Sequence, residues 1–271
     1  GINLLDMAPS YGKGEAESVI GEAFKGALPE GVLTTTKCRV GDTPQSEIFT
    51  LLDKSINASL ERMKLDHVDI LFMHNWIAAD DIPAYRHSTP RSLVENAVIP
   101  AMKRIIESGR ARAWGLTGVG DSAVIIDMLN SGIQPDFIQV VTNLLDSAGG
   151  MTYPNYPAQP RNIISAALHA GTPIMGIRAV QAGALTSKLD RFKAADDPEM
   201  LDFQSAASFR TIAKEIGQSP AFLAHQYALS IDGPATIVLG VKNRDELHEC
   251  ITAEAAGPMD QKLIERIDQA V

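Results

Sequence analysis

Short apolar runs alternate with longer stretches in which apolar positions recur every three or four residues. The short runs have the length of buried strands, and the longer stretches have the period of amphipathic helices. The predicted strands are Ile2–Leu5, Val32–Thr36, Val68–Met73, Ala111–Leu116, Phe137–Val141, Pro173–Ile177 and Thr236–Leu239. The predicted helices are Glu15–Gly26, Pro44–Met63, Ser92–Ser108, Asp121–Ser131, Pro160–Ala170, Phe203–Ser230 (two helices, split near Gly217–Pro220), Asn243–Glu254 and Met259–Val271.

Regular alternation of apolar strands with helices is typical of a parallel sheet that is covered on both faces. No Gly-x-Gly-x-x-Gly turn follows any predicted strand, as a doubly wound dinucleotide-binding sheet would require. We therefore expect a single α/β domain over residues 1–271, a (β/α)8 TIM barrel that lacks its first strand and helix. An open seven-stranded sheet is the alternative. Thr43–Pro44 and Ser219–Pro220 each predict a helix start, and Ala148–Arg161 predicts a loop.

The composition narrows the class of protein. Among 271 residues, 33 are Asp or Glu and 24 are Lys or Arg, so the net charge is -9. An acidic balance argues against nucleic acids and anionic membranes as partners, and no apolar run approaches the length of a membrane span. Cys38 and Cys250 are the only cysteines, and the histidines show no metal-ligand spacing. We expect a cytoplasmic protein without a metal site.

Ionisable residues follow three successive predicted strands. Asp6, Lys37 and His74 each come directly after an apolar run, where the carboxyl ends of parallel strands meet. Buried charges are costly unless they pair, so these side chains are predicted to face one cavity. Tyr11 follows Asp6 in a turn that can bring its phenol over the same cavity.

These four residue types suit acid–base chemistry. A phenol is a weak acid at neutral pH, and a neighbouring Lys ammonium stabilises the phenolate and makes the phenol a better acid. Asp6 is predicted to keep Lys37 charged and fixed, and His74 to orient a substrate oxygen or to help relay the proton.

The segment from Gly1 to Glu15, together with Thr35–Lys37 and Leu71–His74, resembles the signatures of the aldo-keto reductases, and the resemblance covers essentially the whole chain. It implies a (β/α)8 barrel that binds NADP(H) without a Rossmann motif. It also implies a catalytic tetrad of Asp6, Tyr11, Lys37 and His74, in which Tyr11 protonates a carbonyl while the nicotinamide delivers hydride. The family begins with a strand and helix before Gly1, so we expect this chain to start inside the fold and to be unstable alone.

The resemblance also implies cofactor contacts, although several positions depart from the family pattern. Thr117–Gly118 stands where Ser-Asn is usual, Arg178 stands where an aromatic residue stacks on the nicotinamide, and Cys250 replaces an Asn near the adenine. A guanidinium can also stack on a flat ring. The implied cofactor-binding residues are Thr117, Gln139, Arg178, Gly183, Leu185, Gly240, Lys242, Arg244 and Glu246.

Two further functions stay open. Lys37 could form a Schiff base in a barrel aldolase, or the chain could be a non-catalytic nucleotide-sensing or channel-associated subunit. The leading interpretation is an NADPH-dependent oxidoreductase that reduces a small aldehyde or ketone, or oxidises the alcohol. Its substrate depends on the loops Ala78–Arg91 and Ala148–Arg161, and Trp76 is a candidate to line the substrate pocket.

Overall fold

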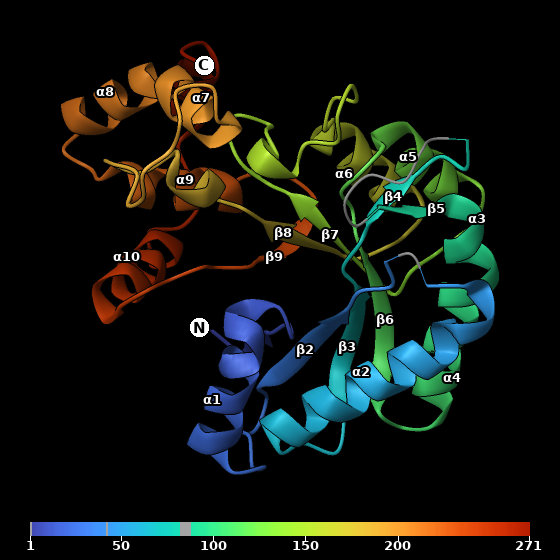
Figure 1. Cartoon of the computed structure of the whole chain (residues 1–271). Coiled ribbons are helices and arrows are strands. Elements are labelled where there is room, and N and C mark those ends of the chain that lie inside the picture. The colour runs from blue at the N-terminus through green and yellow to red at the C-terminus, as the bar shows by residue number, and fades with distance from the viewer. Residues whose placement is uncertain (1, 42, 82–87) are drawn as a thin grey trace. The chain divides into compact units, whose positions relative to one another are not determined.

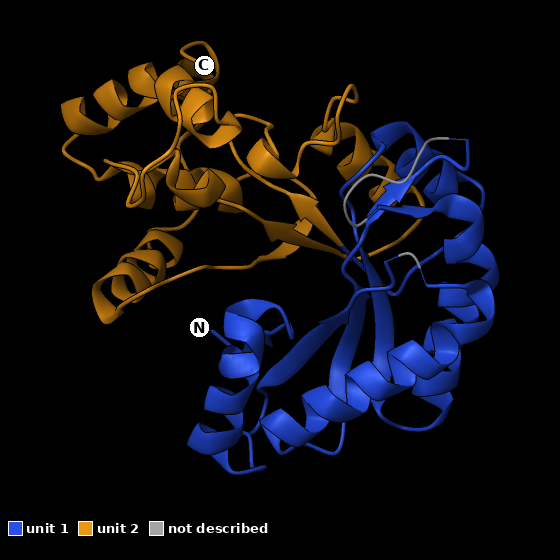
Figure 2. Cartoon of the chain, viewed as in Figure 1, with its two compact units in different colours: residues 1–138 blue, residues 139–271 orange. Residues whose placement is uncertain are grey.

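Every strand that the apolar runs predict is present in the structure, a computed structural model that describes residues 2–41, 43–81 and 88–271. Gly1, and residues 82–87 of the predicted substrate loop, lie outside the described residues. The chain divides into two units, Gly1–Ile138 and Gln139–Val271 (Figure 2). Each unit is described below by itself.

The first unit contains four adjacent parallel strands in the order β1-β2-β3-β6. Figure 1 shows β2, β3 and β6 side by side. They are β1 (Leu4–Asp6), β2 (Leu33–Cys38), β3 (Val68–Met73) and β6 (Ala111–Thr117). Their register pairs Asp6 with Thr35 and Lys37 with Phe72. Phe72 in turn faces Gly115, where an added Cβ would lie 2.3 Å from the Phe72 ring. The missing side chain of Gly115 thus makes room for the aromatic ring in the core.

The helices of the first unit follow the predicted positions closely. They are α1 (Glu15–Phe24), α2 (Ile48–Met63), α3 (Arg91–Leu93), α4 (Ile99–Glu107) and α5 (Ser122–Asn130), with short turns η1 (Tyr11–Gly14) and η2 (Gln45–Glu47). The helix start predicted at Thr43–Pro44 is wrong in detail. The Thr43 hydroxyl donates to the Val40 carbonyl at 2.6 Å instead of capping a helix, and η2 comes between Pro44 and α2.

The predicted helix Ser92–Ser108 is interrupted by a π-turn, η3 (Val94–Val98). Pro100 lies in the first turn of the following helix α4. Proline has no N–H to donate and its ring collides with the carbonyl four residues earlier, so a regular α-helix cannot pass through this position. The interruption therefore has a local cause that is visible in the sequence.

Two short strands were missed by the sequence analysis. β4 (Trp76–Ala78) and β5 (Ser88–Pro90) pair in parallel outside the main sheet. Each has three residues, which is too short for a period-two pattern to show. Trp76 is the first residue of β4 and follows His74 by two positions.

The second unit contains the strand order β7-β8-β9, with β7 (Phe137–Val141) starting at the boundary. Its other strands are β8 (Ile174–Ile177) and β9 (Pro234–Ile237), which pair in parallel. Its helices are α6 (Pro160–His169), α7 (Pro198–Ser205), α8 (Ala207–Glu215), α9 (Pro220–Leu229), α10 (Arg244–Ala255) and α11 (Gln261–Asp268), with turns η4 (Gly149–Met151) and η5 (Gln181–Gly183). A parallel α/β architecture is thus confirmed in each unit.

The predicted stretch Phe203–Ser230 divides as expected, but α7 was missed. The Ser219 hydroxyl accepts the Phe222 N–H at 3.0 Å and caps α9, as Ser219–Pro220 predicts. The start of α7 carries the same signal, since the Asp197 carboxylate accepts the Glu199 N–H at 2.9 Å and Pro198 follows. No helix in the described part of the chain is both long and apolar enough to cross a membrane.

Candidate active site

Lys37 is the centre of a hydrogen-bonded cluster at the carboxyl ends of β1 and β2. Its side chain is 1% exposed, and its ammonium donates to Asp6 Oδ2 at 2.7 Å, to the Met7 carbonyl at 2.9 Å and to Tyr11 Oη at 3.1 Å. The second carboxylate oxygen of Asp6 accepts the Thr35 hydroxyl at 2.6 Å. The ammonium therefore has three acceptors in a fixed geometry, which a buried charge requires.

Local backbone geometry brings Tyr11 to this cluster. After β1 the chain turns through η1, where Tyr11 N–H donates to the Ala8 carbonyl at 3.0 Å. Gly14 closes the turn with φ +94°, and a Cβ there would lie 2.9 Å from Arg62 Cδ. Glycine is thus required both for the left-handed backbone and for the space.

His74 completes the predicted set. It follows β3 directly, and its N–H donates to the Cys38 carbonyl at 2.7 Å. The His74 and Tyr11 rings meet edge to face, with centroids 6.2 Å apart. Tyr11 is 39% exposed while Lys37 behind it is fully buried, so the phenol is the part of the cluster that a ligand can reach. The structure therefore brings all four predicted residues together.

The arrangement can transfer a proton from an accessible phenol. Lys37 Nζ lies 4.7 Å from the centroid of the Tyr11 ring and bonds its oxygen, so the positive charge stabilises the phenolate that remains after proton loss. Asp6 balances that charge and holds the ammonium in place. The His74 ring meets the edge of the same phenol, which is the accessible member of the cluster.

Thr117 at the end of β6 has the property expected of a ligand-binding hydroxyl. It is 3% exposed, and its Oγ1 is buried with no hydrogen-bond partner among the residues that the structure describes. A buried hydroxyl without a partner is costly in a native protein. Thr117 therefore fits the predicted contact with a polar group such as the carboxamide of a nicotinamide.

Two of the predicted cofactor-binding residues, Gln139 and Arg178, belong to the second unit. Gln139 is buried within β7. Arg178 follows β8 with φ +62°, its Nε donates to Gln181 Oε1 at 2.8 Å, and its Nη2 lies 3.4 Å from Glu199. Burial lowers the pKa of Arg178 against the opposing effect of Glu199. The guanidinium is therefore held by Gln181 and Glu199.

The segment Gly183–Thr186 fits a phosphate less well than the sequence predicts. The N–H groups of Gly183, Ala184, Leu185 and Thr186 all donate to carbonyls of residues 180–183. The Leu185 side chain is 0% exposed and belongs to the core. Gly183 and Leu185 thus offer no free backbone N–H to a phosphate. A contact from this segment to the cofactor must use an atom other than these N–H groups.

The segment Gly240–Glu246 leads into α10, as predicted. Lys242 is exposed and its ammonium pairs with Asp190. The Glu246 carboxylate accepts the Lys242 N–H at 2.8 Å and the Asn243 amide at 3.1 Å, and Asn243 caps the helix. Lys242 and Arg244 are exposed cations that an anion can reach. Glu246 instead accepts a backbone N–H and stabilises the turn before α10.

Cys250 lies in a buried pair with His225. Its Sγ is 3.4 Å from His225 Nε2, while His225 Nδ1 donates to the Ala221 carbonyl at 2.8 Å. Burial raises the pKa of Cys250 to about 11 and lowers that of His225. The thiol and the imidazole are therefore both neutral. Their contact joins α9 to α10.

The sequence analysis missed two acidic residues on α7. Glu199 accepts from Arg178, from Arg191 at 2.9 Å and from Lys193 at 2.7 Å. Burial alone would raise its pKa, but hydrogen bonds and charges from Lys193 and Arg191 outweigh burial and lower the pKa to about 2. Asp202, one turn later, accepts from Gln181 at 2.6 Å. The N-cap pair Asp197–Pro198 was the signal in the sequence that could have predicted α7, the helix that carries both acids.

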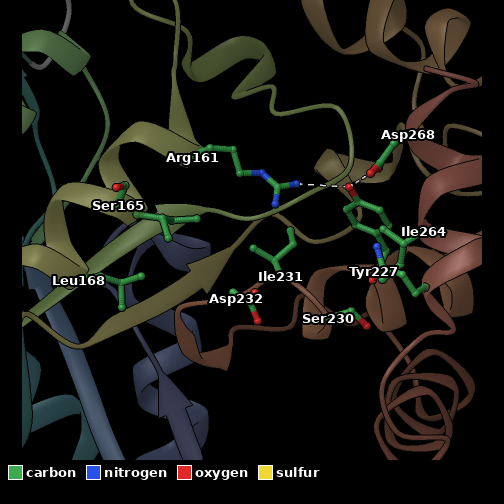
Figure 3. Close-up of a pocket in the computed structure, with 11 residues that line it drawn as sticks. Arg161, Ser165, Leu168, Tyr227, Ser230, Ile231, Asp232, Ile264 and Asp268 are labelled. Atoms are coloured by element: carbon green, nitrogen blue, oxygen red, sulfur yellow. Dashed lines mark hydrogen bonds between the residues drawn. The ribbon is translucent and has the colours of Figure 1, made fainter.

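A cavity of about 340 Å³ lies elsewhere in the second unit, between α6, α9 and α11 (Figure 3). Figure 3 shows Arg161 and Asp268 on either side of the Tyr227 hydroxyl, which donates to Asp268 at 2.6 Å. Burial raises the pKa of Tyr227 to about 12. None of the predicted site residues lines this cavity. Among the described residues, no group of three or more His, Cys, Asp or Glu side chains could hold a metal ion.

A family model and a solved structure each match the whole chain. The model of the aldo/keto reductase family matches residues 1–271. An aldo-keto reductase of Bacillus halodurans, solved in its holo form, superposes with a TM-score of 0.73 at 20% identity over 100% of this chain and 83% of that one. At that identity the likeness shows the fold, and it agrees with the predicted barrel class.

Three curated relatives differ in their named activities. L-galactose dehydrogenase of Arabidopsis thaliana is 24% identical over 99% of this chain and 79% of its own length. An NADH-specific methylglyoxal reductase of Escherichia coli (strain K12) is 30% identical, over 55% of this chain and 46% of its own. A probable voltage-gated potassium channel subunit beta of Arabidopsis thaliana is 23% identical over 100% of this chain and 84% of its own.

Proposed function

The chain belongs to the aldo/keto reductase family, and we propose that it is an NAD(P)H-dependent oxidoreductase that reduces an aldehyde or ketone to the alcohol, or runs the reverse reaction. One observation carries the proposal. The buried ammonium of Lys37 bonds both the Asp6 carboxylate and the exposed phenol of Tyr11. That arrangement suits a proton donor better than a structural ion pair, because the third partner is open to a ligand.

In the proposed reaction Tyr11 is the general acid. The reduced nicotinamide, when bound, supplies a hydride to the carbonyl carbon. The Tyr11 proton passes to the carbonyl oxygen, and the C=O double bond becomes an alcohol. Lys37 stabilises the phenolate left on Tyr11, which regains a proton from solvent, and His74 orients the substrate oxygen. In the reverse direction the same phenolate accepts the hydroxyl proton.

We also propose how the chain holds the cofactor. In the first unit, the partnerless hydroxyl of Thr117 supports a contact with the carboxamide. In the second unit, Gln139 is a further candidate to contact the nicotinamide. Arg178 contacts the nicotinamide, and Lys242 with Arg244 receives a phosphate of the adenosine. Two accessible cations beside a helix start favour a 2′-phosphate, so we propose NADP(H) over NAD(H). The acidic partner Asp190 opposes that preference.

The two alternatives receive less support. A Schiff base requires a neutral amine that a substrate can reach, whereas Lys37 is 1% exposed and bonds three acceptors. A non-catalytic subunit has support from the potassium channel relative. The close contacts among Asp6, Tyr11, Lys37 and His74 favour catalysis, since a binding subunit has no need of an accessible phenol beside a buried ammonium.

The test is a screen for oxidation of NADPH and of NADH over a panel of aldehydes, ketones and sugars. We expect turnover with at least one carbonyl class, and none with Tyr11→Phe. Nucleotide binding without turnover on any substrate would favour the non-catalytic subunit. Trapping of substrate on Lys37 by borohydride would favour the aldolase.

A further inference from the structure

The loop after β8 has an unfavourable backbone. Arg178, Gln181 and Ala182 have φ values of +62°, +45° and +51°, a region that residues with a side chain rarely adopt. Residues held in such conformations persist only when their surroundings fix them, and they gather at functional sites. The loop therefore needs partners that hold it.

The side chain of Gln181, within the loop, makes the first set of contacts that hold it. It is 0% exposed, its Oε1 accepts from Arg178 Nε at 2.8 Å, and its Nε2 donates to Asp202 Oδ2 at 2.6 Å. Asp202 also accepts the Ser147 hydroxyl at 2.8 Å, and Asn143 donates to the Arg178 carbonyl at 3.2 Å. The loop is thus tied to α7 and to the chain after β7.

Glu199 makes the second set of contacts that hold the loop. It is 8% exposed, and its carboxylate faces three cations: Arg178, Arg191 and Lys193. Arg191 also donates to the Ala182 carbonyl at 3.2 Å, so the cation beside Glu199 holds the strained part of the loop directly. Glu199 and Asp202 lie three residues apart on α7, on the same side of the helix.

We propose that Glu199 and Asp202 are positioning residues, which hold the loop Arg178–Gly183 in its strained conformation and keep the Arg178 guanidinium in place for the nicotinamide cofactor. The inference rests on the proposed function, in which Arg178 contacts the cofactor. Neither acid touches the cofactor in this account. Both act through Arg178 and Gln181. They therefore affect the affinity for NADPH and the turnover rate only by fixing the position of the loop.

The test compares three nearly isosteric variants. Glu199→Gln and Asp202→Asn remove the charges that hold the loop. Asp197→Asn is the matched control, because Asp197 lies on the same segment and pairs with Lys193 at 3.1 Å, and Asn preserves its N-cap role. We measure the Kd of NADPH by calorimetry, then kcat and KM of the reduction, and the Tm of each variant.

We expect Glu199→Gln and Asp202→Asn to raise the Kd of NADPH about tenfold and to lower kcat at saturating cofactor, while Asp197→Asn matches wild type. In an Arg178→Ala background, Glu199→Gln should have little further effect on the Kd, because coupled residues are not additive. If Glu199→Gln does not fold, Asp202→Asn provides the same comparison.

Two outcomes overturn the inference. A lower Tm with unchanged Kd and kcat would mean that the two acids are structural, and full additivity with Arg178→Ala would mean that they do not act through Arg178. Failure of the proposed function is distinguishable from both, because wild type would then show no NADPH binding or no turnover on any carbonyl.

Discussion

At the scale of single residues, the chemistry depends on one buried cation with an accessible neighbour. Lys37 is enclosed by Asp6 and the Met7 carbonyl, and the phenol of Tyr11 is its one partner with substantial exposure, at 39%. The four predicted residues come from three strand ends and one turn. Their meeting is the feature from which the proposed activity follows.

Tyr11→Phe should abolish carbonyl reduction and leave NADPH binding nearly intact, because the phenol acts on the substrate oxygen. Loss of a general acid costs on the order of 10²–10⁴ in rate. The measurement is kcat/KM for reduction beside the Kd of NADPH. A variant that retains more than about half of the wild-type activity would show that the proton-donor assignment is wrong.

Lys242→Ala should weaken NADPH binding about tenfold and leave NADH binding almost unchanged. A charge-assisted hydrogen bond corresponds to about 10- to 150-fold in affinity. The lower end is expected, because Lys242 is exposed and already pairs with Asp190. Lys262→Ala, an exposed lysine on α11, is the control. Equal losses for both cofactors would mean that Lys242 supports the fold or the pyrophosphate.

At the scale of elements, close packing of helices holds the active-site turn. Glu17 on α1 is 0% exposed and accepts from Arg62 on α2 at 2.7 Å and from Thr36 on β2 at 2.6 Å. Thr36 precedes Lys37, and α1 follows the Tyr11 turn. The ion pair and the Thr36 hydrogen bond therefore join α1, α2 and β2, next to two members of the cluster.

Gly21→Ala tests that packing. An added Cβ would lie 2.1 Å from the Arg62 carbonyl oxygen, so α1 and α2 must separate. Overpacking costs about 1–3 kcal/mol, which exceeds the gain in helix propensity of up to about 1 kcal/mol. Denaturant unfolding should show a net loss of stability.

Gly150→Ala is the control for this prediction, because the nearest atom to its added Cβ is 3.7 Å away. An unchanged or higher free energy of unfolding for Gly21→Ala would contradict the close approach of α1 and α2.

At the scale of the whole molecule, acid sensitivity should depend partly on a buried histidine. Burial lowers the pKa of His225 below its usual value near 6.5. As the pH falls through 6.5, the unfolded chain takes up a proton that the folded chain does not. The free energy of unfolding therefore falls with pH, by at most about 1.4 kcal/mol per pH unit from this group, until the folded pKa is reached.

His225→Gln should flatten that part of the curve, as measured by urea unfolding between pH 8 and 5. His248→Gln is the control, because His248 is exposed. If the wild-type and His225→Gln curves stay parallel across this range, the buried imidazole does not control the acid response. That residues 1–271 form one domain stays a prediction.

The sequence by itself determined the strands, most helix positions and the four clustered residues. Apolar runs report burial locally, and polar residues that end parallel strands must meet at one edge, so Asp6, Lys37 and His74 could be grouped without a structure. The break at Pro100 and the helix that begins at Pro198 were missed, although both follow from local chemistry.

Only the tertiary structure decided which polar groups already have partners. Lys242 pairs with Asp190, 52 residues away in sequence, and Arg178 with Glu199, 21 residues away. Leu185 lies in the core, and the Thr117 hydroxyl has no partner among the described residues. Such pairings depend on loop conformations that the period of apolar residues does not encode, because a single side-chain contact leaves no repeating pattern along the chain.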